Sequence, residues 1–334
     1  MATNILAHDR ETLRKFSAKR LGNEGACQTG MNEIVVAIPA FNEEVAVGSI
    51  IARCKKYVDR VVVVDDGSRD HTVEVAKLLG AEVISHGKNE GKGAAIRDAF
   101  EYAKNVKAGI LILIDGDGQH NPDEIPFLLA PIVKGDADVV NGSRFLLKKE
   151  NHVPAYRRVG QEVLTMATNA GTRMHITDTQ NGFRAFSRKS FDCFQFHQNG
   201  MAIESEMLMD AANAKMRIKE VPIDVRYDVA GSTYNPISHG FGVLGQVVWL
   251  IAQRRPLFFF GVMGLLLVLS GPIFIFLETR ALNVYSEIAV VYGTMGTLSI
   301  SLGIISLLAG FVLTYVNRMR PTILQFIKSL VQAE

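Results

Sequence analysis

The sequence predicts an α/β domain built on a largely parallel β-sheet, followed by two helices that cross a membrane. Between Glu33 and about Arg226, short apolar runs rich in valine and isoleucine alternate with segments of helical periodicity. Continuous apolar strands separated by helices are typical of parallel sheets that helices cover on both faces. Towards the C-terminus, two long segments without charged side chains replace this alternation, which indicates a change from water to lipid.

The predicted sheet has five strands along the first half of the chain, at residues 33–39, 60–66, 81–85, 110–115 and 138–143. Helices are expected between them, at about 43–57, 70–80, 92–105 and 123–134. Sheets of this kind bind ligands beyond the carboxyl ends of their strands. The polar clusters of the domain follow those ends, so we expect the functional site there.

The two uncharged segments are residues 257–277 and 288–316. Each would form about 30 Å of helix or more, which is enough to cross a bilayer. The connector between them is short, so the pair forms a hairpin with both ends on one side of the membrane. Two basic residues, Arg254 and Arg255, precede the first span, whereas Arg280 is the only basic residue of the connector. The positive-inside bias therefore predicts that the large domain and both termini are cytoplasmic.

A helix along the bilayer surface is predicted just before the first span. Apolar residues recur there at helical spacing, at Ile237, Phe241, Leu244, Val248 and Ile251. A neighbouring tryptophan, Trp249, and two arginines favour the bilayer surface over packing beneath the large domain. The predicted parts of the chain are an N-terminal arm (1–31), the α/β domain (32–235), the interface helix (236–255), the membrane hairpin (256–317) and a cytoplasmic tail (318–334).

Small residues recur every four positions in the second span, at Ser299 and Gly303 and at Ser306, Gly310 and Thr314. This spacing permits close helix contact. The contact is either within the hairpin or between two copies of the chain, and both alternatives stay open.

Composition excludes some functions. The 334 residues carry a net charge of +2, which is too balanced to indicate nucleic-acid binding. The three cysteines lack the paired spacing of a zinc or redox site, so packing of reduced thiols is expected. Residues 1–31 lack the continuous apolar core of a signal peptide, and no role is predicted for them.

The stretch LILIDGDGQH places Asp115 and Asp117 directly after a strand, each followed by glycine. Residues i and i+2 of a strand point the same way, so the two carboxylates repel unless a cation lies between them. Taken alone, the stretch is better explained as a polar turn, because Asp-Gly is common in turns. A divalent cation bound to a pyrophosphate would instead use both carboxylates, with Gln119 or His120 nearby.

Polar residues also follow the first two strands, in FNEE (41–44) and DDGS (65–68). Helix capping explains both clusters, although acidic groups at strand ends also hold the ribose or base of a nucleotide. The later stretch HGKNEGKG resembles a phosphate-binding loop but has the wrong spacing for a P-loop. What remains is Lys92 at a helix N-terminus, a favourable place for an anion.

The motifs IPAFNEE, VDDGS, NEGKGAA, DGDGQH, NGSRF, DTQNGFRAFSR and VPIDVRY follow one another along the chain. With them, residues 33–235 resemble a family-two glycosyltransferase of the GT-A fold, in particular the dolichyl- and polyprenyl-phosphate sugar synthases. The C-terminal hairpin is similar to the small membrane anchors of some members. The resemblance implies a Rossmann-like sheet and inverting transfer of one hexose from a nucleotide sugar to dolichyl or polyprenyl phosphate at the cytoplasmic membrane face.

The resemblance also implies roles for individual residues. The nucleotide would be held by Pro39, Phe41, Glu43, Asp65, Asp66, Lys92 and Asp115. Mg²⁺ or Mn²⁺ would be bound by Asp115, Asp117 and Gln119.

A phosphate acceptor is already ionised, so it needs cationic positioning rather than a strong base. The candidate cations are Arg144, Arg157, Arg158, Arg184 and Arg226, because the guanidinium fork suits phosphate. For Arg144 and Arg226, a role in binding the acceptor is favoured over a surface salt bridge. Arg144 and Asp117 are the candidate catalytic residues. Glu204 and Glu206 either cap a helix or contact sugar hydroxyls.

Three alternatives remain. A processive polysaccharide synthase is disfavoured because the Gln-x-x-Arg-Trp element of such enzymes is absent. The only tryptophan, Trp249, is preceded by Val248 and not by arginine. A membrane-tethered nucleotide-sugar sensor or scaffold would not need the acidic pair. A GDP-mannose donor is the third. A UDP-sugar, UDP-glucose or UDP-N-acetylglucosamine, is favoured because residues 204–240 resemble archaeal members that use UDP-sugars.

Overall fold

The computed structural model describes residues 33–146, 174–200, 202–226, 255–282 and 286–331, with a few single positions within 162–169 and 245–253. The chain divides into two compact units, Met1–Val247 and Val248–Glu334. The predicted arm, most of the predicted interface helix, Arg157 and Arg158 lie outside the described residues, so those predictions stay untested.

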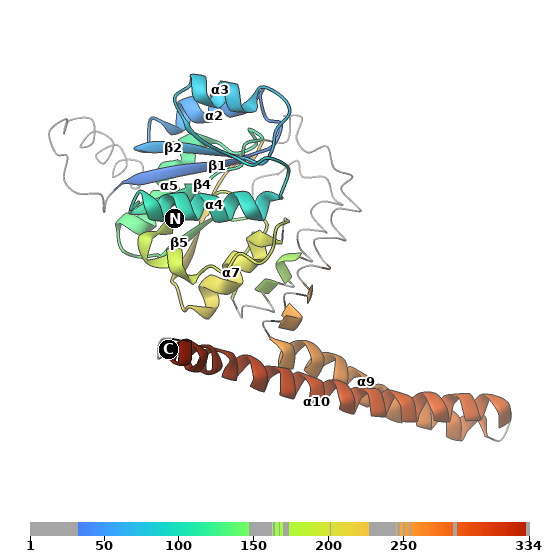
Figure 1. Ribbon diagram of the computed structural model, residues 1–334. Coiled ribbons are helices and arrows are strands. Elements are labelled where there is room, and N and C mark those ends of the chain that lie inside the picture. Colours follow the sequence, from blue (N-terminus) through green and yellow to red (C-terminus); the bar gives the residue numbers. More distant parts are fainter. Residues whose placement is uncertain are drawn as a thin grey trace. The chain divides into compact units, whose positions relative to one another are not determined.

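The first unit is built on a seven-stranded sheet in the order β3-β2-β1-β4-β6-β5-β7 (Figure 1). Its strands are β1 (Ile34–Ala40), β2 (Arg60–Asp65), β3 (Glu82–Ser85), β4 (Ile110–Leu113), β5 (Val139–Ser143), β6 (Arg184–Ser187) and β7 (Ile218–Pro222). Among the described strands of this sheet, only β6 runs antiparallel to its neighbours, β4 and β5. The largely parallel sheet predicted from the sequence is therefore confirmed.

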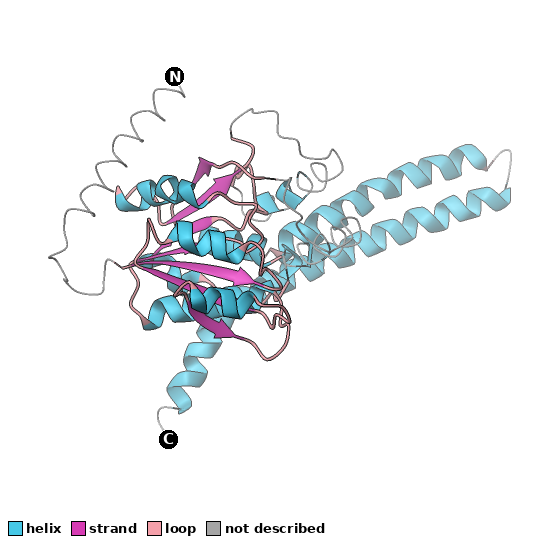
Figure 2. Cartoon of the chain, turned by 90° about the horizontal axis from the view of Figure 1, so that it is seen from above, coloured by secondary structure: helices cyan, strands magenta, loops and turns pink. Residues whose placement is uncertain are grey.

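Helices cover both faces of the sheet (Figure 2). They are α2 (Val47–Cys54), α3 (Thr72–Leu78), α4 (Lys92–Asn105), α5 (Ile125–Val133) and α7 (Ile203–Asn213), with short 3₁₀ turns η1 (Pro122–Glu124) and η2 (Arg188–Cys193). Side chains alternate along a strand, so Val36 and Ile38 of β1 pack with α2 and α5, whereas Val35 and Ala37 pack with α4 and α7. Burial on both faces explains why the strands are continuously apolar.

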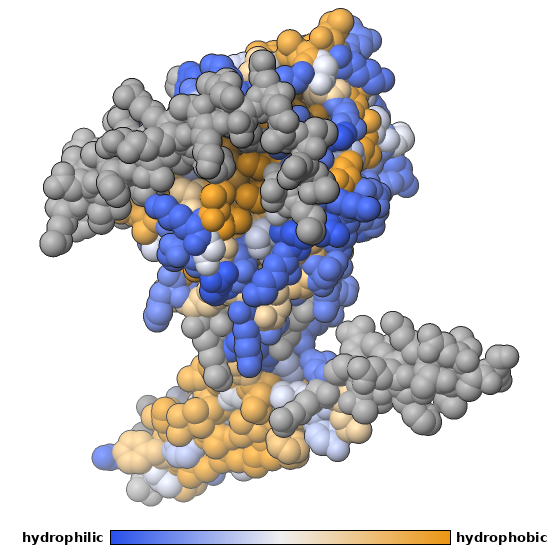
Figure 3. Space-filling model, turned by 90° about the vertical axis from the view of Figure 1, so that its left-hand side faces the viewer, coloured by the Kyte–Doolittle hydropathy of each residue, from blue (hydrophilic) through white to orange (hydrophobic). Residues whose placement is uncertain are grey.

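The second unit contains two long helices, α9 (Pro256–Ala281) and α10 (Ser286–Val331). α9 and residues 288–317 of α10 are long and apolar enough to cross a membrane. Only 11% and 17% of their most apolar stretches is buried, unlike the core helices of soluble domains. Apolar residues cover the face of this unit seen in Figure 3. The described helix α10 also continues through much of the predicted tail.

Glycine lets the two helices of this hairpin approach closely. A Cβ added at Gly264 would lie 2.7 Å from the carbonyl oxygen of Gly303, and a Cβ at Gly303 would lie equally close to that of Gly264. The Ser306 hydroxyl donates to the carbonyl of Phe260 at 2.8 Å. Small residues of the second span thus allow close contact within the hairpin, which is one of the two alternatives predicted from their spacing.

Candidate functional site

The loops that follow β1, β2 and β4 meet at one edge of the sheet. Ala40 and Asp65, the last residues of β1 and β2, are partners in the parallel register. The backbone N–H of Asp66 donates to the carbonyl of Ala40 at 2.9 Å, and that of Gly116 donates to Pro39 at 3.3 Å. Strand order therefore brings three of the predicted polar clusters together.

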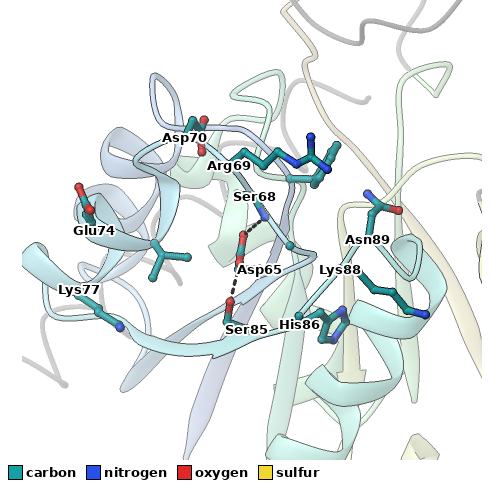
Figure 4. Close-up of a pocket in the computed structure, with 14 residues that line it drawn as sticks. Asp65, Ser68, Arg69, Asp70, Glu74, Lys77, Ser85, His86, Lys88 and Asn89 are labelled. Carbon is teal, nitrogen blue, oxygen red and sulfur yellow. Dashed lines mark hydrogen bonds between the residues drawn. The ribbon is translucent and has the colours of Figure 1, made fainter.

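A cavity of about 540 Å³ opens between the loops after β1, β2 and β3 (Figure 4). Its lining includes Phe41, Asp65, Arg69, His86 and Lys88. The Asp65 carboxylate accepts hydrogen bonds from the Ser68 N–H at 3.1 Å and the Ser85 hydroxyl at 2.7 Å. The cavity lies within the size range of small-molecule sites. Its lining contains the fixed carboxylate of Asp65 and the cations of Arg69 and Lys88.

Asp66 fixes the loop that precedes α4. Its carboxylate accepts the backbone N–H groups of Glu90 and Gly91 at 2.8 and 2.9 Å and contacts Nδ1 of His86. The other His86 nitrogen lies 2.9 Å from Asp98. Burial lowers the pKa of His86, but hydrogen bonds to the two aspartates outweigh it and raise that pKa. In this conformation Asp66 shapes the cavity wall.

The glycines around Lys92 serve backbone packing. A Cβ added at Gly93 would lie 1.8 Å from the carbonyl oxygen of Gln198, and the Gly93 N–H donates to Asn199 at 2.8 Å. The Lys92 ammonium contacts two carboxylates, with Asp115 Oδ1 at 2.7 Å and Glu204 Oε1 at 2.6 Å. Burial lowers the pKa of Lys92, yet these carboxylates raise it overall. The helix N-terminus is thus occupied by protein groups.

The two aspartates of the DGDGQH motif have different surroundings. Asp115 contacts Lys92 and lies 3.5 Å from Nε2 of His120. Burial raises its pKa, but the Lys92 and His120 charges and hydrogen bonds lower it overall. Asp117 accepts the Gln119 N–H at 3.0 Å, and burial and the charge of Asp115 raise its pKa. Asp115 is therefore held as an anion, whereas Asp117 makes no ion pair with any residue that the structure describes and accepts a hydrogen bond from its own loop.

A third acidic group, Glu43, lies close to the same motif. Burial raises the pKa of Glu43 to about 7, and the charges of Asp117 and Asp70 add to the shift. Mutual repulsion of this kind marks a place where a cation would be favourable.

Side chains that could bind a divalent cation are present, although they do not form a complete coordination site by themselves. Among the described residues, no group of three histidine, cysteine, aspartate or glutamate side chains is poised to hold a metal. A cation bound to a pyrophosphate needs only one or two carboxylates, because phosphate and water oxygens supply the rest. Asp117 and Asp115 fit that requirement. The Gln119 carbonyl accepts the Arg226 N–H at 2.9 Å, which joins the C-terminal end of the domain to this loop.

The Glu43 pKa leads to a testable pH dependence. Folded Glu43 keeps its proton up to about pH 7, whereas the unfolded group, with a pKa of 4.5, loses it earlier. The folded state binds more protons in this window, so its contribution to the free energy of unfolding falls as pH rises through it. A bound cation would offset the repulsion. We expect Mn²⁺ with UDP to raise the Tm more at pH 8 than at pH 6, and Glu43→Gln to reduce that difference. An equal Mn²⁺ effect at both pH values in the wild type would contradict this.

The three candidate acceptor arginines that the structure describes lie in different environments. Arg144 makes a two-pronged ion pair with Asp178, with Nε and Nη2 at 2.6 and 2.7 Å from its oxygens. Arg184 is only 1% exposed, and it donates to the carbonyls of Glu204 and Thr179. Both of these hydrogen bonds are to backbone groups of the protein. Arg226 is exposed and follows a β-bridge between His120 and Val225 beside the acidic loop.

Buried acids on α7 organise the segment that packs on Gly93. Glu206 accepts the backbone N–H groups of His197 and Gln198 at 2.8–3.0 Å, and Asp210 accepts that of Gln195 at 2.9 Å. The role of Glu204 stayed open in the sequence because its partner Lys92 is 112 residues away. Glu206 instead holds the backbone of the segment just before α7. Both were candidate sugar contacts, and both have partners within the protein.

Residues 35–194 match the family described as Glycosyl transferase family 2. A UDP-N-acetylglucosamine–dolichyl-phosphate N-acetylglucosaminyltransferase of Methanococcus voltae is 32% identical over 215 residues, covering 58% of this chain and 86% of the relative. The chain belongs to glycosyltransferase family 2. It is therefore a glycosyltransferase, as the resemblance of its motifs implied.

Two further similarities extend this finding for the family-2 enzyme. An undecaprenyl-phosphate mannosyltransferase of Micrococcus luteus is 27% identical, covering 66% of this chain and 95% of the relative. The structure of glucosyl-3-phosphoglycerate synthase from Mycobacterium tuberculosis with Mn²⁺ and UDP matches with a TM-score of 0.55 and 22% identity, over 69% of this chain and 85% of that one. The latter similarity confirms the GT-A fold.

Proposed function

We propose that this glycosyltransferase transfers one hexose from a UDP-sugar to a dolichyl or polyprenyl phosphate, with inversion at the anomeric carbon. The observation that carries the proposal is the meeting of a nucleoside-sized cavity and the Asp115–Asp117 pair at one sheet edge, in a chain that also has an apolar hairpin. The relatives from Methanococcus voltae and Micrococcus luteus are named for transfer to dolichyl and undecaprenyl phosphate, which supports the lipid-phosphate acceptor.

The donor would occupy the cavity and the acidic loop beside it. Asp65 and Phe41 would contact the nucleoside, and Pro39 and Asp66 would shape its surroundings. Mg²⁺ or Mn²⁺ would be held by Asp117 with Asp115 and Gln119 beside it. When bound, such a cation stabilises the negative charge of the departing nucleotide diphosphate.

The acceptor side needs cations rather than a base. A phosphate oxygen would attack the anomeric carbon as the bond to the nucleotide diphosphate breaks, and no proton has to be removed. Arg144 and Arg226 would hold the phosphate, and Asp178 would keep the Arg144 fork in one orientation. The α7 carboxylates Glu204 and Glu206 already contact Lys92 and backbone N–H groups, which agrees with an acceptor that needs no general base.

The membrane hairpin would keep the enzyme at the bilayer that contains its acceptor. We propose boundaries near residues 32–235 for the catalytic domain and 256–317 for the anchor, with the catalytic domain and both termini cytoplasmic. Arginines before α9 and after the second span support this orientation.

Donor and acceptor can be identified with the purified full chain. UDP-glucose, UDP-N-acetylglucosamine and GDP-mannose are each incubated with Mn²⁺ and a short polyprenyl phosphate, and the lipid product is measured. We expect a single-sugar lipid phosphate from a UDP-sugar, with UDP released. Preference for GDP-mannose would favour the mannosyl alternative, which the Micrococcus luteus relative supports. Binding without turnover would indicate a sensor, and a polymer would indicate a processive synthase.

A further inference from the structure

Lys92 contacts both Asp115 of the DGDGQH motif and Glu204, a carboxylate on helix α7 outside that motif. Its ammonium lies 2.7 Å from Asp115 Oδ1 and 2.6 Å from Glu204 Oε1, so it is shared almost equally between the loop after β4 and helix α7. The Glu204 side chain is only 4% exposed. One ammonium here faces two carboxyl groups, and the buried Glu204 is not solvated by water.

Glu204 is held in place independently of Lys92. It lies in the first turn of α7, where every residue from Ile203 to Ala211 is buried. Its backbone carbonyl accepts a hydrogen bond from Nη1 of Arg184 at 2.8 Å. Arg184 is itself buried and also donates to Thr179. The carboxylate is therefore a fixed partner for Lys92.

We propose that Glu204 is a positioning residue for the metal site, which acts by drawing the Lys92 ammonium partly away from Asp115. The inference rests on the metal site of the proposed function. With Glu204 present, the two carboxylates and the Lys92 ammonium carry a net charge of −1, so negative charge remains for a divalent cation. Without it, Lys92 and Asp115 form a neutral pair, and Lys92 competes with the divalent cation for the Asp115 oxygens.

The chain offers a matched control two residues away. Glu206 lies on the same helix and is also buried, but it accepts N–H groups from His197 and Gln198 and does not contact Lys92 in the described structure. Glu206→Gln removes one buried negative charge from α7, as Glu204→Gln does. A general loss of charge or of fold would affect both variants, whereas an effect through Lys92 is confined to Glu204.

The test measures Mn²⁺ affinity of the full chain with UDP and no acceptor, from the electron paramagnetic resonance of free Mn²⁺. Glu204→Gln is expected to weaken Mn²⁺ binding about tenfold. Glu206→Gln is expected to lower the Tm with Mn²⁺ affinity unchanged. Glu204→Asp keeps the charge at a greater distance from Lys92 and should give a smaller loss, and it replaces Glu204→Gln if that variant does not fold. Unchanged affinity in the folded Glu204 variant, or an equal loss in Glu206→Gln, would overturn the inference.

A double-mutant cycle shows whether Glu204 acts through Lys92. In a Lys92→Gln background, Glu204→Gln should weaken Mn²⁺ binding by less than twofold, because the competing ammonium is gone. A tenfold loss in both backgrounds would show a direct field effect of the Glu204 charge and would overturn the mechanism. If the wild type fails to bind Mn²⁺ with UDP, the metal site and this inference both fail. If the wild type binds Mn²⁺ and transfers sugar while the cycle shows no coupling, only the inference fails.

Discussion

Asp117→Asn is expected to lower the rate of sugar transfer by about 1000-fold, or ~4 kcal/mol of transition-state stabilisation. Asp117 is the acid of the motif that a cation would neutralise most favourably, since Lys92 already contacts Asp115. Asparagine keeps the side-chain oxygen that accepts the Gln119 N–H, so the loop conformation should survive. The measurement is the initial rate at saturating Mn²⁺, donor and lipid phosphate, together with the Tm and membrane insertion.

A surface aspartate provides the control for this substitution. Asp123 makes an exposed ion pair with Arg53 at 2.7 Å, and Asp123→Asn removes the same charge without touching the acidic loop. Exposed pairs contribute little to stability, so this variant should keep wild-type turnover. Wild-type turnover in Asp117→Asn as well would remove Asp117 from the metal site.

The fold was predictable where burial makes a strand or helix uniformly apolar. β1, β2 and β4 are covered on both faces, and the spans of α9 and α10 lack charge, so a simple pattern marks each of them. β6 and β7 escaped prediction. Their sequences, RAFS and IKEVP, are short and contain charged residues, and β6 is the antiparallel strand of the sheet. Tertiary pairing decides such strands more than local sequence does.

The meeting of the predicted polar clusters at one sheet edge was predictable, but several side-chain contacts were not. Strand ends located Asp65, Asp115 and Asp117, because parallel strands end at a common edge. Lys92 looked like an anion site because its glycines and helix start are local features. One of its two carboxylate partners, Glu204, is 112 residues away, and the segment that packs on Gly93 is nearly as distant. No local motif records such pairs.

Arg144→Ala is expected to raise the KM for lipid phosphate and lower kcat/KM for it about 100-fold, or ~3 kcal/mol, with UDP binding nearly unchanged. The Arg144 guanidinium is oriented by Asp178, which is 1% exposed, and an oriented fork is well suited to a phosphate. Removing Arg144 also leaves that buried carboxylate without its ion pair, which costs about 3 kcal/mol or more of stability. Lost folding could therefore be mistaken for lost acceptor binding.

The double variant Arg144→Ala/Asp178→Asn separates the two effects. Neutralising the buried acid should recover much of the Tm, because no unpaired charge remains inside the protein. It should leave the acceptor defect in place, since the phosphate still lacks its guanidinium. Arg144→Lys, which keeps the charge but loses the two-pronged geometry, should fall between wild type and Arg144→Ala. If the double variant uses lipid phosphate as well as the wild type does, Arg144 supports the fold through Asp178 and the acceptor binds elsewhere.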